Sequence, residues 1–358
     1  MKNRLIVLAI LSGSAVVLIA TWWVFRSPSL PKFSPDRELV VNTVAEPPAE
    51  ALPVLDLTLE STFGSNHNLD YLPPENLRTL IFTGDVLLAR SVNYQIWQHN
   101  NPSYPFEKVA DVLRAADLTF INLENPLVEN CPLTNEGMIF CGDPRNVRGL
   151  VDAGIDVVGL ANNHTLNYGQ AGLGETVSIL KKNGLRPVCS GEFATQDIRG
   201  LRFAFLAYND VPARVDSERM GERIREANEA AAVVTIYFHW GSEYTAYPNQ
   251  RQEALAHLVV EAGADLVVGS HPHWIQAVEI YQGVPILYSL GNFVFDQEWS
   301  QKTKEGAAAR CTFYHNQLID IELLPVLIEN YSQPRWLVGE EGRQILEELE
   351  QISRKLTL

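Results

Sequence analysis

Basic residues are scarce in this sequence, which carries 28 Lys and Arg against 43 Asp and Glu, for a formal net charge of -15. No broad positive face is available to neutralise a phosphate backbone, so we expect no nucleic-acid partner. The same charge repels polyanions at long range. A polyanionic substrate would therefore have to be held by a local cation or a metal ion.

Cysteine is scarce as well, with four residues and no Cys-x-x-Cys pair, so a thiolate zinc site is not indicated. Cys131 and Cys141 lie in one loop-like stretch that an oxidising compartment would let close into a ring, and the sequence leaves the paired and the free states open. Cys189 and Cys311 stand in apolar surroundings, which is typical of small buried hydrophobic residues.

The N-terminus has a long run without charge. Leu5 to Phe25 spans about 21 residues, or roughly 30 Å as a helix, which is enough to cross a bilayer. Lys2 and Arg4 precede this run and would stay cytoplasmic, which places the rest of the chain on the extracytoplasmic side. We interpret residues 1–26 as an uncleaved transmembrane anchor, with a cleaved signal peptide as the alternative.

The remainder divides into three parts. Residues 27–77 are rich in proline and lack periodic patterning, which predicts a linker. Residues 78–330 alternate short apolar runs with helical patterns, which predicts one α/β domain with a largely parallel sheet covered by helices and an antiparallel addition around Gly283. Residues 331–358 are expected to form a helical tail packed on this domain.

Polar residues that can bind a metal follow the predicted strands again and again. Because carboxyl ends of parallel strands share one edge of a sheet, we expect these residues to converge there. The candidate ligands are Asp85, Glu124, Asn163, His239, His271 and His273.

The sharpest motif is GSHPH, with two imidazoles one residue apart directly after an apolar strand. Pro272 favours an extended backbone at His271, which would point both rings to the same side. Imidazole, carboxylate and amide ligands together suit Mn, Fe, Zn or Co, and the sequence does not choose among these metals.

The ordered motifs GD, NLE, ANNH, HWGSEY, GSHPH and SLGNF resemble the capsule-synthesis protein CapA family, which is linked to poly-gamma-glutamate and is similar to calcineurin-like metallophosphoesterases. The resemblance implies a four-layer α/β/β/α sandwich with two sheets inside. It also implies one or two divalent metal ions bound by the six candidate ligands, with His164 as the catalytic residue beside Asn163.

One position departs from the phosphoesterase pattern, because Leu87 stands where that pattern has a metal-binding histidine. One metal then keeps only Asp85, Glu124 and His273, so both a mononuclear and a dinuclear site remain open. Arg90 is either a catalytic, substrate-binding clamp or a surface residue, and Asp296 is expected to be a turn residue. Further substrate-binding candidates, which would act by orienting groups at the site, are Glu243, Tyr244 and Asn292.

Two functions fit these residues. The chain is either a metal-dependent hydrolase acting on a phosphoester or on an amide of an envelope polymer, or a polymer-binding and export subunit whose metal site holds a polyanion. Both place it beside the membrane, with an anionic polymer or phosphoester as its substrate and other polymer-synthase subunits as partners. A scaffold that has lost its metal is the third interpretation.

Overall fold

The computed structural model describes residues 57–356, apart from residues 65, 136 and 212. The chain separates into a unit that ends at Pro53 and a second unit that starts at Val54, and the described residues all belong to the second. The expected anchor, residues 1–26, lies outside the described residues. None of the helices in the described part of the chain is both long and apolar enough to span a bilayer.

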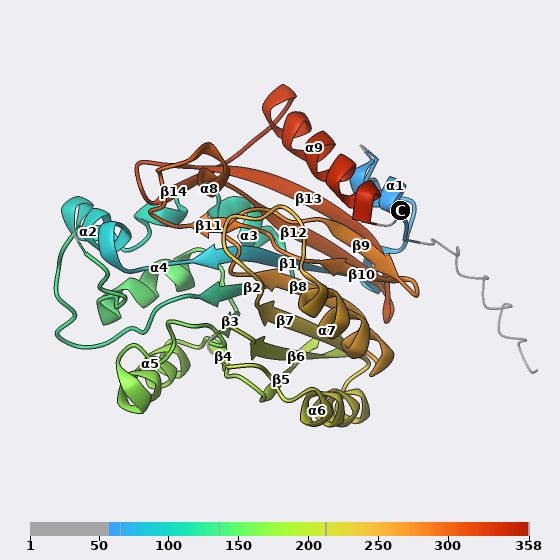
Figure 1. Ribbon diagram of the computed structural model, residues 1–358, viewed down its shortest axis with the longest axis horizontal. Helices are drawn as coiled ribbons and strands as arrows, with labels where there is room; N and C mark the ends of the chain where they lie inside the picture. Colours follow the sequence, from blue (N-terminus) through green and yellow to red (C-terminus); the bar gives the residue numbers. More distant parts are fainter. Residues whose placement is uncertain (1–56, 65, 136, 212, 357–358) are drawn as a thin grey trace, which may run out of the picture. The chain divides into compact units, whose positions relative to one another are not determined.

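The described strands form two sheets, as the family resemblance implies, rather than the single sheet that the alternating pattern alone predicts (Figure 1). The first sheet has eight strands in the order β14-β13-β12-β1-β2-β3-β4, with β11 paired to the end of β1. Its strands are β1 (Leu77–Val86), β2 (Leu118–Leu123), β3 (Val157–Gly159), β4 (Arg186–Val188), β11 (Asn292–Val294), β12 (Glu305–Tyr314), β13 (Gln317–Glu329) and β14 (Gln333–Trp336). β1 to β4 run parallel, whereas β12, β13 and β14 are antiparallel additions.

The second sheet has six strands in the order β5-β6-β7-β8-β10-β9. Its strands are β5 (Phe193–Ile198), β6 (Leu201–Asn209), β7 (Val233–His239), β8 (Leu266–Ser270), β9 (Val278–Tyr281) and β10 (Val284–Leu287). β6, β7, β8 and β10 are parallel, and β9 pairs antiparallel with β10. The antiparallel addition expected around Gly283 is therefore confirmed.

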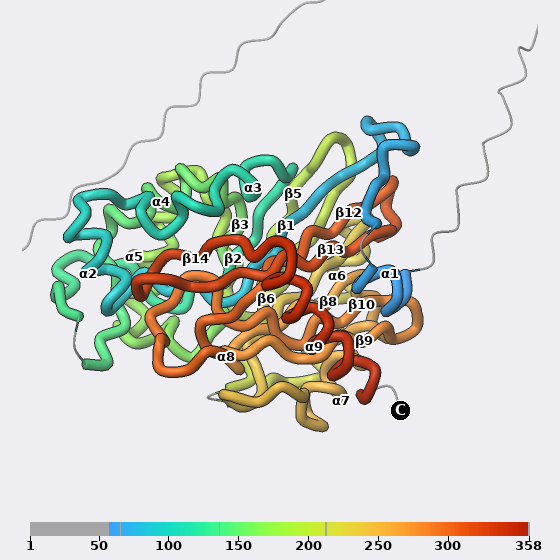
Figure 2. Tube along the Cα trace, turned by 90° about the horizontal axis from the view of Figure 1, so that it is seen from above, coloured from blue at the N-terminus to red at the C-terminus, as the bar shows by residue number. Residues whose placement is uncertain are grey.

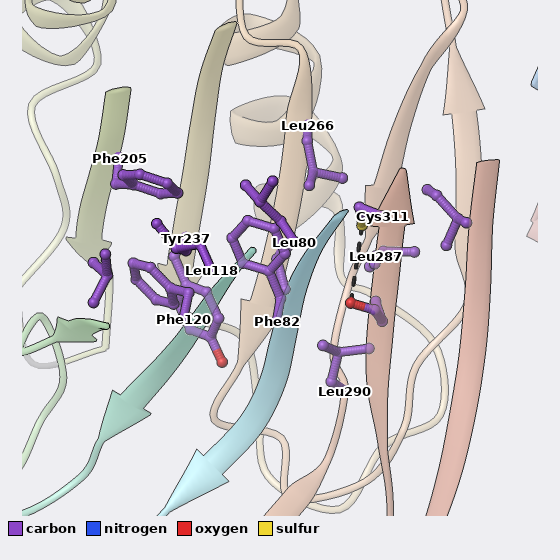
Figure 3. Packing of buried hydrophobic residues seen from close by; sticks show 14 of the residues in the cluster. Leu80, Phe82, Leu118, Phe120, Phe205, Tyr237, Leu266, Leu287, Leu290 and Cys311 are labelled. Atoms are coloured by element: carbon purple, nitrogen blue, oxygen red, sulfur yellow. Dashed lines mark hydrogen bonds between the residues drawn. The ribbon is translucent and has the colours of Figure 1, made fainter. Parts of the chain in front are cut away.

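The two sheets pack face to face through an apolar core. Phe120 of the first sheet stacks on Tyr237 and Phe205 of the second, with ring centroids 5.0 Å and 6.0 Å apart (Figure 3). Strands whose residues are buried on both faces read as continuous apolar runs, as LTFINL and VVTIYFH do here. A polar residue at the end of such a run therefore stands out in the sequence as a candidate for a buried polar group.

Helices cover the outer face of each sheet. The helices are α1 (Leu59–Phe63), α2 (Arg90–His99), α3 (Ala110–Ala115), α4 (Val147–Asp152), α5 (Gly169–Lys182), α6 (Ser217–Ala230), α7 (Gln250–Glu261), α8 (Gln301–Lys304) and α9 (Glu340–Leu356). Apolar residues of α2 to α5 share a cluster with the first sheet, and those of α6 and α7 share one with the second. Figure 2 shows α3 and α4 on the opposite side of the strands from α7.

Segments from both ends of the described chain pack on this core. Leu349 of α9 is buried among residues of both sheets, so the C-terminal helix lies on the domain. Leu57, within the segment expected as a linker, belongs to the same core, and α1 contacts α9 and β13. Residues 333–336 of the expected helical tail form β14 instead, because they pair with β13.

Candidate metal centre

Three candidate oxygen ligands follow neighbouring parallel strands of the first sheet. Asp85 is the penultimate residue of β1, Glu124 follows β2 directly, and Asn163 lies in the turn after β3. The side chains of Asp85 and Glu124 are fully buried, and Asn163 is half-buried. The parallel order of β1, β2 and β3 brings them to one edge of this sheet.

Three buried imidazoles come from the second sheet. His239 ends β7, and His271 and His273 follow β8. The expectation of an extended backbone at His271 is wrong, since φ is 93° at His271 and 56° at His273. Positive φ at a residue with a bulky side chain costs of order 1–3 kcal/mol and persists where the surrounding structure fixes it, which is common at functional sites.

The carboxyl ends of both sheets meet, so all six candidate ligands lie in one cluster. His239 Nε2 lies 2.8 Å from Asn163 Oδ1 and 3.7 Å from Glu124 Oε1. His273 Nδ1 lies 3.6 Å from Asp85 Oδ2. Three groups of three residues each offer ligand atoms within 4.8 Å of one another, namely Glu124 with His239 and His271, Asp85 with Glu124 and His273, and Glu243 with His271 and His273.

Several buried polar atoms in this cluster have no hydrogen-bond partner. In the described part of the chain, neither Glu124 Oε1 nor Glu124 Oε2 has one, and His271 Nδ1 has none either. A buried carboxylate without donors is costly, and a metal ion is one of the few groups that can stabilise it. Because carboxylate and imidazole are also the donors that Mn, Fe, Zn and Co accept, the residues fit a divalent cation.

Burial shifts the pKa of each of these groups in the direction that favours its neutral form. It raises the pKa of Asp85 to about 6, and burial together with the Asp85 charge raises the pKa of Glu124 well above its usual range. Burial lowers the pKa of His271 to about 4 and that of His273 to about 3. Neutral imidazoles are ready to bind a metal, and a cation between the carboxylates would favour their ionised form.

Asn122 and Ser270 connect the candidate ligands of the two sheets, and neither is among the site residues predicted from the sequence. The buried Asn122 amide donates to Asp85 Oδ1 at 2.8 Å, and its Oδ1 accepts from Asn162 Nδ2 at 3.1 Å. Ser270 Oγ lies 3.0 Å from His239 Nδ1. The signal for Asn122 was its place within the apolar strand LTFINL, where a polar residue requires a partner.

Asn292, one of the residues expected to act by orienting groups at the site, is hydrogen-bonded to a ligand candidate. Its Oδ1 lies 2.8 Å from His273 Nδ1, while its amide donates to Gln297 Oε1 at 3.1 Å and to Thr303 O at 2.9 Å. This pattern makes Asn292 Oδ1 the acceptor and His273 Nδ1 the donor, so Nε2 is the free nitrogen of His273. An outer partner of this kind fixes the tautomer and the orientation of a metal-binding imidazole.

His164 lies at the edge of the ligand cluster. Its Nε2 is 3.7 Å from Glu124 Oε1, and its Nδ1 lies 3.1 Å from the Asn167 amide. Burial and the nearby Arg90 charge lower the pKa of His164 to about 4. The ring is less enclosed than those of the ligand candidates, with a side-chain exposure of 19%.

Arg90 is a buried residue rather than a solvated surface arginine. It is 8% exposed, and its guanidinium forms two hydrogen bonds to Asp296 and lies 4.6 Å from the centre of the Phe140 ring. Asp296 therefore does more than the expected turn residue, since it fixes Arg90 and also accepts from Ser91 N at 3.2 Å. Because Asp296 accepts hydrogen bonds from these guanidinium donors, Arg90 is held in place and contributes a fixed positive charge beside the site.

Glu243 and Tyr244 lie at the exposed side of the cluster, in the loop after β7. Tyr244 has φ of 62°, and its ring centroid is 6.3 Å from that of His273. Tyr244 N donates to Pro272 O at 2.8 Å, which joins this loop to the turn that carries both histidines. The two residues are thus placed where a substrate entering the cluster would pass.

Comparison with known proteins identifies the family. The family model described as "Bacterial capsule synthesis protein PGA_cap" matches residues 79–297. This chain belongs to the PGA_cap family. The "PGA biosynthesis protein CapA" of Bacillus subtilis (strain 168) is 31% identical over 268 residues, which cover 68% of this chain and 70% of that protein. The "Capsule biosynthesis protein CapA" of Bacillus anthracis is 32% identical over 282 residues, which cover 71% and 68%.

The resemblance to the capsule-synthesis family that rests on six ordered motifs is thereby confirmed. Among solved structures, a hypothetical protein from Thermus thermophilus matches 69% of this PGA_cap member and 98% of its own chain, with a TM-score of 0.48 and 16% identity. That likeness is too weak to indicate fold or function.

In this PGA_cap member, Leu87 does not belong to the cluster of candidate ligands. Its fully buried side chain packs with Ala89, Phe140, Phe295 and Ile328. An apolar side chain in these surroundings cannot coordinate an ion, so the group of Asp85, Glu124 and His273 gains no fourth ligand from position 87.

The cysteines resolve as one pair and two free thiols. Cys131 and Cys141 form a disulfide with their Cα atoms 5.8 Å apart, which settles the alternative left open by the sequence. Cys189 and Cys311 are free, and Cys311 is buried in the core between the sheets, as expected.

Proposed function

We propose that this PGA_cap member acts in capsule or poly-gamma-glutamate synthesis through a metal-dependent hydrolase-type site. The observation that carries this proposal is the buried Glu124 carboxylate, which lacks a hydrogen-bond partner among the described residues and faces Asp85, His239 and His271. The names of the two Bacillus relatives support the biological role. The two helix-covered sheets support a four-layer, metallophosphoesterase-like sandwich.

One or two divalent cations would be held by the six candidate ligands. A bound cation supplies Lewis-acid polarisation of a substrate oxygen and lowers the pKa of water. The chain itself orients the ligands, because Asn122 fixes Asp85 and Asn292 fixes His273. The surrounding apolar residues keep bulk water away from the buried carboxylates.

His164 would act as the general acid. It lies at the partly exposed edge of the cluster, with Nε2 facing Glu124 and Nδ1 beside Asn167. An anionic substrate at the open side of the site would raise the pKa of His164 from its value of about 4, so that the protonated ring could give a proton to the leaving group. Arg90, fixed by Asp296, adds a positive charge that favours an anionic substrate.

The test uses the purified chain loaded with Mn or Zn, a model phosphodiester and a gamma-glutamyl anilide. We expect metal-dependent turnover of one of them and a loss of at least about a hundredfold in His164→Ala with bound metal unchanged, as for loss of a general acid. His99→Ala, an exposed histidine at the end of α2, is the control and should retain full activity. Turnover of neither substrate at any pH would refute the hydrolase role.

A polymer-binding role without cleavage is the second candidate, and a cavity of about 600 Å³ favours it. Arg214, Arg219 and Arg223 line this cavity, which also reaches Asn162 beside the ligand Asn163. Among the described residues, Arg214 and Arg219 form no ion pair, and Tyr208, which is 4% exposed, has a hydroxyl without a partner. Local arginines of this kind can hold a carboxylate polymer against the negative net charge of the chain.

Binding of poly-gamma-glutamate to charge-reversal variants tests this second role. Arg219→Glu should weaken binding at least about fivefold, because it places a negative charge in the cavity. Arg225→Glu is the matched control, since it makes the same charge change on the exposed side of the same helix. If both variants weaken polymer binding equally, the effect comes from net charge alone, and the proposal of a specific binding site is contradicted.

The membrane anchor at residues 1–26 and the extracytoplasmic position remain part of this proposal. They place the site where an exported envelope polymer and the subunits that synthesise it would be found. Protease treatment of intact cells followed by detection of the domain distinguishes the two sides of the membrane. Full protection of the domain until the cells are lysed would contradict an extracytoplasmic position.

A further inference from the structure

The buried side of the ligand cluster is formed by Asp85, Glu124 and His273. Asp85 and Glu124 lie at the bottom, where both side chains are fully buried. His273 offers one ligand atom to this carboxylate pair, but Leu87 packs into apolar surroundings instead of adding a ligand. Among the described residues, a cation held by Asp85, Glu124 and His273 would gain no ligand from position 87, so a further ligand would have to approach from the open side.

Glu243 lies on this open side, next to His271 and His273. Its carboxylate offers an oxygen that lies, with ligand atoms of His271 and His273, within a group whose members are at most 4.8 Å apart. This group shares His273 with Asp85 and Glu124, and it shares His271 with Glu124 and His239. Glu243 is thus adjacent to both parts of the centre. It forms no ion pair with Lys or Arg in the part of the chain that the structure describes.

The loop that carries Glu243 is fixed from both sides. Gly241 has φ of 84°, and a Cβ there would lie 2.5 Å from Gln252 Oε1, so the loop follows the Gln252 side chain closely. Gln252 in turn donates to Gln276 Oε1 at 2.8 Å, and Gln276 donates to Thr245 O at 3.1 Å. These contacts fix the loop at Gly241 and at Thr245, on either side of Glu243.

The loop is also attached to the turn that carries His271 and His273. Tyr244 N donates to Pro272 O at 2.8 Å, and Pro272 lies between His271 and His273. Tyr244 adopts φ of 62° to make this contact, a conformation that costs free energy at a non-glycine residue. The loop and the two imidazoles therefore form one preorganised unit, as expected for residues that bind the same ion.

We propose that Glu243 is a protein ligand of the metal centre, closing its open side in a chain that has leucine at position 87. The inference rests on the proposed metal-dependent function and changes the role expected for Glu243 from substrate contact to metal binding. A carboxylate at this point adds negative charge to the ligand set, which raises affinity for a divalent cation.

Metal content and affinity test the inference directly. Apo wild type, Glu243→Gln and the control Glu229→Gln, an exposed residue on α6, are titrated with Mn and Zn in a calorimeter and measured for bound metal after dialysis. We expect Glu243→Gln to lose one bound ion or to raise Kd for an ion at least about tenfold. Its cobalt-substituted form should also show a changed visible spectrum, while thermal unfolding of the apo form stays the same.

The outcomes separate this inference from the proposed function. Wild type and Glu243→Gln with the same metal content, the same Kd and the same cobalt spectrum would overturn the inference and leave the metal centre intact. The same result with a raised KM for substrate would return Glu243 to substrate binding. A wild-type chain that binds neither Mn nor Zn would overturn the proposed function, and this inference with it.

Discussion

Phe140 stacks on the imidazole of His164, with ring centroids 3.6 Å apart and the ring planes inclined by 10°. The Arg90 guanidinium lies over the same phenyl ring, 4.6 Å from its centre. Phe140 directly precedes Cys141, so the disulfide loop places an aromatic ring between the two residues expected to be catalytic. None of these three side chains belongs to the ligand cluster itself.

Phe140→Ala should therefore lower turnover without removing metal. We expect a loss of about tenfold or more, because His164 loses the surface that fixes its ring and small displacements of catalytic groups are costly. Metal content by elemental analysis and turnover of the model substrates measure the two effects separately. Phe140→Leu keeps part of the packing, so its turnover should lie between those of wild type and Phe140→Ala. Loss of metal from Phe140→Ala would contradict this account.

The Cys131–Cys141 disulfide should stabilise the domain by constraining the unfolded chain. For a ring of this length, loop-closure entropy predicts a contribution of about 3 kcal/mol. Urea unfolding of wild type with and without reductant measures it. The double variant Cys131→Ser/Cys141→Ser should resemble reduced wild type and should not respond to reductant. A wild type equally stable in both conditions would contradict the expected constraint.

His67 should make stability depend on pH. Its Nδ1 lies 2.8 Å from Asp320 Oδ1 and its Nε2 lies 2.9 Å from Gly64 O, so both nitrogens face acceptors and both must carry protons to donate. The Asp320 carboxylate raises the pKa of His67 above its usual value of 6.5. Because the folded pKa is the higher one, this contribution is complete below about pH 6.5 and is lost as pH rises through the folded pKa.

The difference in Tm between wild type and His67→Gln measures this contribution, because other titrating groups largely cancel. We expect His67→Gln to lower Tm more at pH 6 than at pH 9. A difference that is the same at both pH values would show that the imidazolium form contributes no extra stability.

Gly84 should be required for the register between β1 and β11. A Cβ at this position would lie 2.1 Å from Gly291 O, so Gly84→Ala has to push β11 away. The shift would displace Asn292, which pairs with Asp85 and holds His273. We expect a loss of several kcal/mol in unfolding free energy, of order 2–5 kcal/mol, and weaker metal binding.

Gly174→Ala is the control for this substitution. Gly174 lies in α5 with open space around its Cα, so alanine there should be neutral or stabilising by up to about 1 kcal/mol. Urea unfolding and metal titration of both variants give the comparison. Equal stability of Gly84→Ala and wild type would contradict the tight approach of β11 to β1.

The ligand cluster could be predicted because its members break local rules. Asp85, Glu124 and His239 are polar residues at the ends of strands that are otherwise apolar, and such residues need a partner or a function. Their convergence follows from parallel strands sharing an edge, whichever sheet each strand joins. Asn122 obeys the same logic, since it lies within a buried strand, but one asparagine among apolar residues is a weak signal.

Other features depend on long-range contacts that no local pattern encodes. The pairing of Arg90 with Asp296 joins residues 206 positions apart. The hairpin of β12 and β13 was not among the expected elements, although it extends the first sheet beside β1. The division into two sheets is likewise decided by which strands pair, and the alternation of strand and helix is the same for one sheet or two.

The backbone at His271 shows a further limit. A following proline favours an extended residue, but His271 has φ of 93° because its N–H donates to Asp85 Oδ2 at 3.0 Å within the site. Local preference is overruled here by a contact across the two sheets, which is common where function requires an unusual conformation.

The most direct test of the metal centre is anomalous diffraction from crystals grown with Mn or Zn. We predict an anomalous peak bounded by Glu124, His239 and His271, within about 2.0–2.3 Å of ligand atoms of these residues. A crystal of the folded domain that shows no peak at this position, with the Glu124 oxygens still lacking a partner at saturating metal, would contradict the account.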